Sequence, residues 1–187
     1  MGYTFIEKDK PEDSTKKGGS KTSFVAIEPE WTLDQIVFQD SLKEQLADIV
    51  SFCKNKDQII NDWELYRFMK GKGCIGINLW GIPGTGKSIA AEAIAASLGM
   101  KLIQASYSSL MDSLQGNTEK NISALFETAV NENCVILFDE ADGLLSARKT
   151  GGANSETSNM IKSHLLNILD RSTAIVVFTT NFFKSYD

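Results

Sequence analysis

The segment 81–88, GIPGTGKS, places three glycines, a lysine and a serine at the spacing G-x-x-x-x-G-K-[ST]. Glycines let backbone N–H groups turn inward around phosphate oxygens, where Cβ atoms would collide. Lys87 would bring positive charge to the β- and γ-phosphates, and the Ser88 hydroxyl would be a ligand for Mg²⁺. An apolar segment precedes the motif and an alanine-rich one follows it, so a glycine-rich turn matching by chance is disfavoured. The residues predicted to bind nucleotide here are Gly81, Ile82, Pro83, Gly84, Thr85, Gly86, Lys87, Ser88 and Ile89.

Two carboxylates follow a second apolar segment, CVILF, at Asp139 and Glu140. Ligands of parallel α/β sheets bind at the carboxyl ends of the strands, where these two residues would emerge. Asp139 would hold Mg²⁺ through a water ligand, and Glu140 would polarise the water that attacks a γ-phosphate. A solvated loop is the usual place of paired acids. The buried strand directly before them favours the catalytic interpretation, while Asp142 is also able to cap the next turn.

Short apolar segments alternate with helical ones along most of the chain. Near-continuous apolar strands between helices are typical of a parallel sheet covered on both faces, so the fold class is α/β with three layers. The predicted strands are 74–80, 101–107, 134–142 and 174–181, and the predicted helices between them are 88–99, 118–133 and 155–170.

The N-terminal part of the chain divides into a polar tail and two helical segments. Residues 8–23 are polar and charged, which predicts a flexible tail at 1–23 before a domain at 24–187. Apolar spacing predicts a helix from Ser41 and a second amphipathic segment at 57–73.

Composition excludes several classes of protein. With 24 acidic and 19 basic residues the formal charge is -5, which disfavours a general nucleic-acid-binding surface. The chain has no CxxC pair among its three cysteines, Cys53, Cys74 and Cys134. We therefore expect neither a zinc site nor a disulfide framework, and we expect a location in the reducing cytoplasm. No segment approaches eighteen apolar residues, so no membrane span is expected.

Taken together, GIPGTGKS, ILFDEAD and FTTN resemble the ATPase core of the AAA+ family, nearer its protein-remodelling branch, over residues 31–187. The resemblance implies a P-loop NTPase sandwich that binds ATP or ADP with Mg²⁺. The strand after the Walker B acids ends in this family in a polar sensor residue that contacts the γ-phosphate or the attacking water. That residue is Asn181 here; the other interpretation is an asparagine that forms a turn after a strand.

Two further segments resemble family features in part. WTLDQIVF is similar to the family's lead-in to the domain, which implies that Ile36 and Val37 line the adenine base; Phe38 stands where glycine is usual. The segment at 109–121 is similar to the one that carries the first pore loop. Its triplet at 114–116 is Leu-Gln-Gly and lacks the aromatic residue that grips a polypeptide.

Some family features have no counterpart in the printed sequence. The resemblance implies an arginine finger beyond the sensor residue, yet Arg67, Arg148 and Arg171 all precede Asn181. It also implies a fifth strand beside the P-loop strand and a C-terminal helical lid. We therefore expect a partial domain with the P-loop strand at an exposed edge.

The sequence supports one leading hypothesis and two alternatives. The leading one is an ATPase core with Lys87, Glu140 and Asn181 as catalytic residues and Ser88 and Asp139 as metal ligands. It would remodel proteins or their complexes as a ring, hexameric in the full-length form. The alternatives are a nucleotide-binding switch with little hydrolysis and a DNA-dependent clamp-loader or initiator type, which the acidic balance disfavours.

Overall fold

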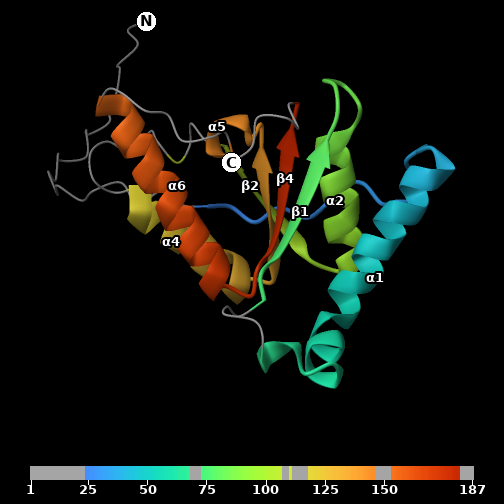
Figure 1. Ribbon diagram of the computed structural model, residues 1–187. Coiled ribbons are helices and arrows are strands. Elements are labelled where there is room, and N and C mark those ends of the chain that lie inside the picture. The colour runs from blue at the N-terminus through green and yellow to red at the C-terminus, as the bar shows by residue number, and fades with distance from the viewer. Residues whose placement is uncertain (1–23, 68–72, 107–109, 111–117, 146–152, 182–187) are drawn as a thin grey trace, which may run out of the picture.

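The computed structural model describes residues 24–67, 73–106, 110, 118–145 and 153–181, and the predicted tail at 1–23 lies outside them. Four parallel strands form one sheet in the order β1-β4-β3-β2 (Figure 1). The strands are β1 (Ile75–Trp80), β2 (Lys101–Ser106), β3 (Cys134–Asp139) and β4 (Ile175–Thr180). The helical elements are α1 (Asp40–Asp62), η1 (Leu65–Arg67), α2 (Lys87–Leu98), α4 (Thr118–Asn131), α5 (Asp142–Leu145) and α6 (Ala153–Arg171).

The sheet is the middle of three layers. Helices α1 and α2 cover one face, and α4, α5 and α6 cover the other (Figure 1). Strand β3 shows why both faces need cover, because Val135 and Leu137 pack with residues of α1 and α2, while Ile136 and Phe138 pack with residues of α4 and α6 on the other face. The rings of Phe138 and Phe178 stack with centroids 5.3 Å apart, which locks β3 and β4 in register.

The predicted α/β class and the parallel sheet are confirmed. Each predicted strand is present, and β3 ends at Asp139 because the chain turns at Glu140, which has a positive φ of 53°. The N-terminal helices differ from prediction. One helix, α1, runs without a break to Asp62, and the turn η1 follows it. The apolar spacing changes near residue 57 without ending the helix, since no glycine or proline interrupts it there.

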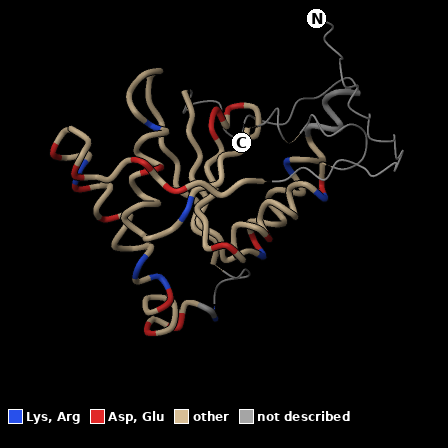
Figure 2. The backbone as a smooth tube through the Cα atoms, turned by 180° about the vertical axis from the view of Figure 1, so that it is seen from behind, with Lys and Arg blue, Asp and Glu red and all other residues tan. Residues whose placement is uncertain are grey.

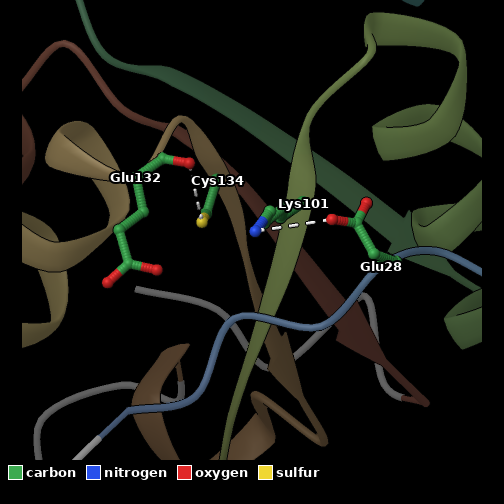
Figure 3. Close-up of polar contacts among 4 residues, drawn as sticks. All are labelled: Glu28, Lys101, Glu132 and Cys134. Atoms are coloured by element: carbon green, nitrogen blue, oxygen red, sulfur yellow. Dashed lines mark hydrogen bonds and ion pairs between the residues drawn. The ribbon is translucent and has the colours of Figure 1, made fainter.

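The two edges of the sheet differ. Strand β1 pairs only with β4 among the described residues, as expected of an edge strand, and Trp80 at its end is 63% exposed. The outer edge of β2 is covered by the N-terminal segment. Ile27 forms an antiparallel bridge to Leu102, with backbone N–H···O distances of 2.8 and 2.9 Å. Beside the bridge, Glu28 and Lys101 form an ion pair at 3.4 Å (Figure 3).

Charged residues of both signs are interspersed along the described backbone (Figure 2). Among the described residues, no helix combines the length and the apolar character that a membrane crossing requires.

The three cysteines are unpaired, and burial raises the pKa of each thiol. The Cys134 thiol donates to the Glu132 carbonyl oxygen at 3.5 Å (Figure 3). Burial raises the pKa of Cys74 to about 11, and the nearby charge of Lys56 opposes that shift. Cys74 is therefore a neutral thiol that packs against the core at neutral pH.

Cys74 gives a pH-dependent stability. A free thiol in an unfolded chain has a pKa of about 8.5, so the unfolded chain loses this proton first as the pH rises. We expect Cys74 to contribute to stability below that pH, and its contribution to fall as the pH approaches 11. Urea unfolding of wild type and Cys74→Ala between pH 8 and 10.5 measures the difference, and equal slopes of stability against pH would contradict it.

Candidate functional site

The P-loop begins where β1 ends and leads directly into α2. The Gly81 N–H still bonds the Thr180 carbonyl oxygen of β4 at 3.2 Å, so the loop starts from a fixed point. Gly84 and Gly86 then have φ values of 80° and 83°, in the left-handed region that L side chains rarely adopt. Gly86 is the N-cap of α2, so these turns aim the first N–H groups of the helix at the loop's interior.

The Lys87 ammonium lies at the centre of this loop. It donates to the carbonyl oxygens of Gly81 at 2.9 Å and Ile82 at 3.0 Å, and to Oδ1 of Asn181 at 3.0 Å. These three contacts use all three ammonium protons. The third contact brings the predicted sensor residue, Asn181, directly beside Lys87.

The Asp139 carboxylate is the second centre of the site. The Ser88 hydroxyl lies 3.2 Å from each of its oxygens, Thr179 donates to Oδ1, and the Gln104 amide donates to Oδ2 at 3.3 Å. The Glu140 N–H also approaches Oδ1 at 3.2 Å. Neutral donors from three different elements therefore hold one charged acceptor at the tip of β3.

The chemistry of this donor set fits Mg²⁺. Ser88 and Asp139 offer oxygen atoms, which this hard cation prefers. No three residues among His, Cys, Asp and Glu come together as a metal site within the described part of the chain. That fits a magnesium ion held mainly by phosphate oxygens and water, with few protein ligands.

A cavity of about 180 Å³ joins the two centres. It brings together residues from the P-loop, from the turn after β3 and from the end of β4, at the carboxyl edge of the sheet. Its lining residues are Pro83, Gly84, Lys87, Ser88, Asp139, Glu140, Thr179, Thr180 and Asn181.

The topology explains why the site forms there. The chain leaves β1 for β2 at the far side of the sheet and returns through β3 to β4, which lies beside β1. Helix α2 covers one face, whereas α4 and α6 cover the other, so the connections diverge between β1 and β4. Ligands of open α/β sheets bind at such a switch point.

A second cavity of about 250 Å³ adjoins the P-loop on the side of α1. The cavity is lined by Gly81, Thr85, Gly86 and Lys87 of the loop region and by Phe38 with other apolar residues. Its size and apolar walls suit a nucleotide base.

The residues predicted for the adenine base lie outside this second cavity. Ile36 is half-buried, and the Val37 side chain is 99% exposed. Phe38, where the sequence departs from the family pattern, is the lining residue instead. The base contacts stay a prediction. Ile82 and Ile89 of the P-loop segment are also exposed and line neither cavity.

Other candidates fall outside the site. Arg67 pairs with Glu64 at 2.8 Å in η1, and Arg171 is exposed just before the amino end of β4, opposite the phosphate cavity. Arg148 and the triplet at 114–116 lie outside the described residues. The His164 Nε2 lies 3.0 Å from the Glu119 carbonyl oxygen, so this histidine links α6 to α4.

Sequence reasoning missed three residues of the site. Gln104 reaches Asp139 from β2, Thr179 contacts Asp139 and Glu140 from β4, and Thr180 donates to Oδ1 of Asp142. The sequence feature that could have identified all three is a polar residue near the carboxyl end of a predicted buried strand.

The fold and the site define a three-layer α/β domain in which a glycine-rich loop with Lys87, the acidic pair Asp139 and Glu140, and the polar strand end at Asn181 lie around one cavity. Residues 77–187 match the family model described as "ATPase family associated with various cellular activities (AAA)". The chain belongs to the AAA family.

Curated relatives agree with this assignment. The chain is 32% identical over 162 residues to an uncharacterized AAA family ATPase of Sinorhizobium fredii, covering 86% of this chain and 47% of that protein. It is 32% identical to vacuolar protein sorting-associated protein 4 of Dictyostelium discoideum, covering 83% of this chain and 33% of that protein. The chain therefore spans half or less of the length of these relatives.

Solved structures agree as well. The crystal structure of the FIGL-1 AAA domain superposes with a TM-score of 0.64 at 26% identity, covering 89% of this chain and 53% of that chain. The same domain in complex with ADP superposes with a TM-score of 0.63, covering 89% of this chain and 54% of that one.

Gly86 offers a test of the loop geometry. An L side chain in the left-handed region costs about 1–2 kcal/mol, so Gly86→Ala should lower the free energy of unfolding by about that amount. Gly76→Ala in β1 is the matched control, because its Cβ would lie an ordinary 4.0 Å from the Phe178 ring. Alanine in a strand is favoured over glycine by about 0.5–1 kcal/mol, so this control should be neutral or stabilising. Urea unfolding compares them, and equal effects of the two changes would refute the role of the turn.

Proposed function

We propose that this chain is the ATP-binding core of an ATPase that hydrolyses ATP with Mg²⁺ and uses the energy to remodel proteins or protein complexes. The observation that carries the proposal is the meeting of Lys87, Ser88, Asp139, Glu140 and Asn181 around one 180 Å³ cavity. Family membership supports it, since the matching family model is one of ATPases.

Each residue has a role that follows from its position. Lys87 and the N–H groups of the loop bind the β- and γ-phosphates, and Ser88 with Asp139 holds the metal. Mg²⁺ held by these two residues would offset the negative charge of the phosphates. Glu140 accepts a proton from the attacking water, and Asn181 orients the γ-phosphate or that water. Phe38 and the apolar cavity beside the loop receive the base.

The assembled form that we propose is a homo-oligomeric ring, hexameric in the full-length protein, acting on a protein substrate. The similarity to vacuolar protein sorting-associated protein 4 supports a substrate that is a protein or protein complex. We propose a cytoplasmic location, which the three unpaired cysteines support.

Nucleotide binding tests the phosphate site. A hydrogen bond to a charged group contributes about 1.5–3 kcal/mol. Lys87→Ala should therefore weaken binding of a fluorescent ATP analogue with Mg²⁺ by about 10- to 150-fold. Lys101→Ala is the matched control, because Lys101 lies at the opposite edge of the sheet and pairs only with exposed Glu28 at the surface.

Lys101→Ala should bind as the wild type does. Equal affinity of wild type and Lys87→Ala, or no binding by either, would reject the site.

A second candidate is a nucleotide-binding switch that hydrolyses little ATP. The observation in its favour is that the described arginines, Arg67 and Arg171, lie away from the phosphate cavity. A cation at the γ-phosphate contributes about 10³–10⁵ in rate in phosphoryl-transfer enzymes.

Turnover per subunit, measured at rising protein concentration, separates the two candidates. An ATPase whose site is shared between subunits should gain turnover as subunits associate, and Glu140→Gln should abolish that gain while nucleotide binding persists. Flat turnover near zero with tight binding would favour the switch. Stimulation by DNA would instead revive the clamp-loader alternative.

A further inference from the structure

Thr179 contacts Asp139, the last residue of β3, and the two residues that follow it, Glu140 and Ala141. Its hydroxyl donates to Oδ1 of Asp139 and accepts the Glu140 N–H at 3.1 Å. Its carbonyl oxygen accepts the Ala141 N–H at 2.8 Å. The side chain is 1% exposed, so these contacts are shielded from water. One residue of β4 thus fixes the whole turn that carries the acidic pair.

That turn needs fixing because Glu140 is not a glycine. Its φ of 53° lies in the left-handed region, where a non-glycine residue costs about 1–3 kcal/mol unless its surroundings hold it. The bonds from Thr179 reach the N–H groups of Glu140 and of Ala141, on both sides of the strained residue. They set the direction in which the exposed Glu140 side chain leaves the backbone.

The Asp139 carboxylate is oriented by the same hydroxyl. Thr179 holds Oδ1 and Gln104 holds Oδ2 from opposite neighbouring strands, which leaves the group facing Ser88 at 3.2 Å. Hydrogen-bond partners that orient metal ligands in this way typically change metal affinity by about 10- to 100-fold when they are removed.

Thr180 shows that this arrangement is specific to one position. It is as buried as Thr179, at 1% exposure, and its hydroxyl also donates to a carboxylate. Because neighbouring side chains of a strand point to opposite faces, the acceptor of Thr180 is Asp142 and not Asp139. The hydroxyl of Thr179 bonds Asp139 and the Glu140 N–H, whereas that of Thr180 bonds Asp142.

We propose that Thr179 is a positioning residue of the nucleotide site, whose hydroxyl aims Asp139 at the magnesium ion and sets the backbone of Glu140. The proposal rests on the proposed function, since it assumes a nucleotide bound with Mg²⁺. Thr179 also lies two residues before Asn181, which directly follows β4. A γ-phosphate contact at Asn181 therefore acts on the strand end that holds Asp139 and Glu140.

The test compares Thr179→Val, which keeps the shape and removes the hydroxyl, with Thr179→Ser, which keeps the hydroxyl. The measurement is the Kd of a fluorescent ATP analogue with Mg²⁺ and with EDTA. The gain in affinity is the ratio of the Kd in EDTA to the Kd with Mg²⁺. Thr179→Val should lower this ratio about tenfold relative to the wild type. Affinity in EDTA should stay at the wild-type value, because Lys87 and the loop N–H groups do not contact Thr179. Thr179→Ser should retain the wild-type gain.

Folding is controlled in two ways. Thr128→Val removes a hydroxyl from the opposite end of the domain, where Thr128 bonds the Ala124 carbonyl oxygen, and it should leave the Mg²⁺ dependence unchanged. If Thr179→Val does not fold, Thr179→Ala and Thr179→Ser form a second pair that differs in the hydroxyl. Far-UV circular dichroism and the melting temperature report folding for every variant.

Three outcomes would overturn the proposal. A wild-type Mg²⁺ gain in Thr179→Val would show that the hydroxyl does not position Asp139. An equal loss in Thr179→Ser would show that packing matters and the hydroxyl does not. Absence of any Mg²⁺ gain in the wild type would reject the proposed function itself, and so distinguishes its failure from failure of the role of Thr179.

Discussion

The burial of polar groups at the carboxyl edge of the sheet is the constraint on which the site depends. Strands β3 and β4 are buried almost throughout, yet they end in Asp139, Thr179 and Thr180. An unsatisfied buried polar group costs about 1–3 kcal/mol, and a buried charge costs more. The threonine hydroxyls meet this cost by donating to Asp139 and Asp142. The bonds that make the strand ends stable therefore also orient the carboxylate of the site.

The same constraint connects the P-loop to the rest of the domain. Lys87 bonds two carbonyl oxygens of its own loop and Oδ1 of Asn181, so the loop and the end of β4 share one hydrogen-bond network. Ser88 extends that network to Asp139. Because coupled polar networks are worth more than their separate pairs, a phosphate that displaces one partner of Lys87 changes the balance of the others. Under the proposed function, a nucleotide bound in the loop would therefore also affect the end of β4.

Most of the fold between 74 and 181 could be predicted from the sequence, because apolar strands are delimited there by glycines and charged residues. The continuous helix α1 could not, since its apolar spacing shifts near residue 57 while no residue breaks it. Lys87, Ser88, Asp139 and Glu140 belong to motifs with fixed spacing, and the structure brings them into one cavity. Gln104 and Thr179 could not be found in that way. Their contacts depend on strand register, and a threonine in a strand otherwise serves as an ordinary β-branched residue.

Phe38 marks the point where pattern and structure diverge for a physical reason. The resemblance points to Ile36 and Val37 as the residues that line the base. The Val37 side chain, however, is 99% exposed and packs against no other part of the described domain. A phenyl ring at Phe38 fills part of the apolar wall, whereas a glycine would leave only backbone there. An aromatic ring can stack on a purine, and it also occupies volume that a purine would use. Under the proposed function, Phe38 therefore affects the choice of base more directly than Ile36 and Val37, because it lines the cavity and they do not.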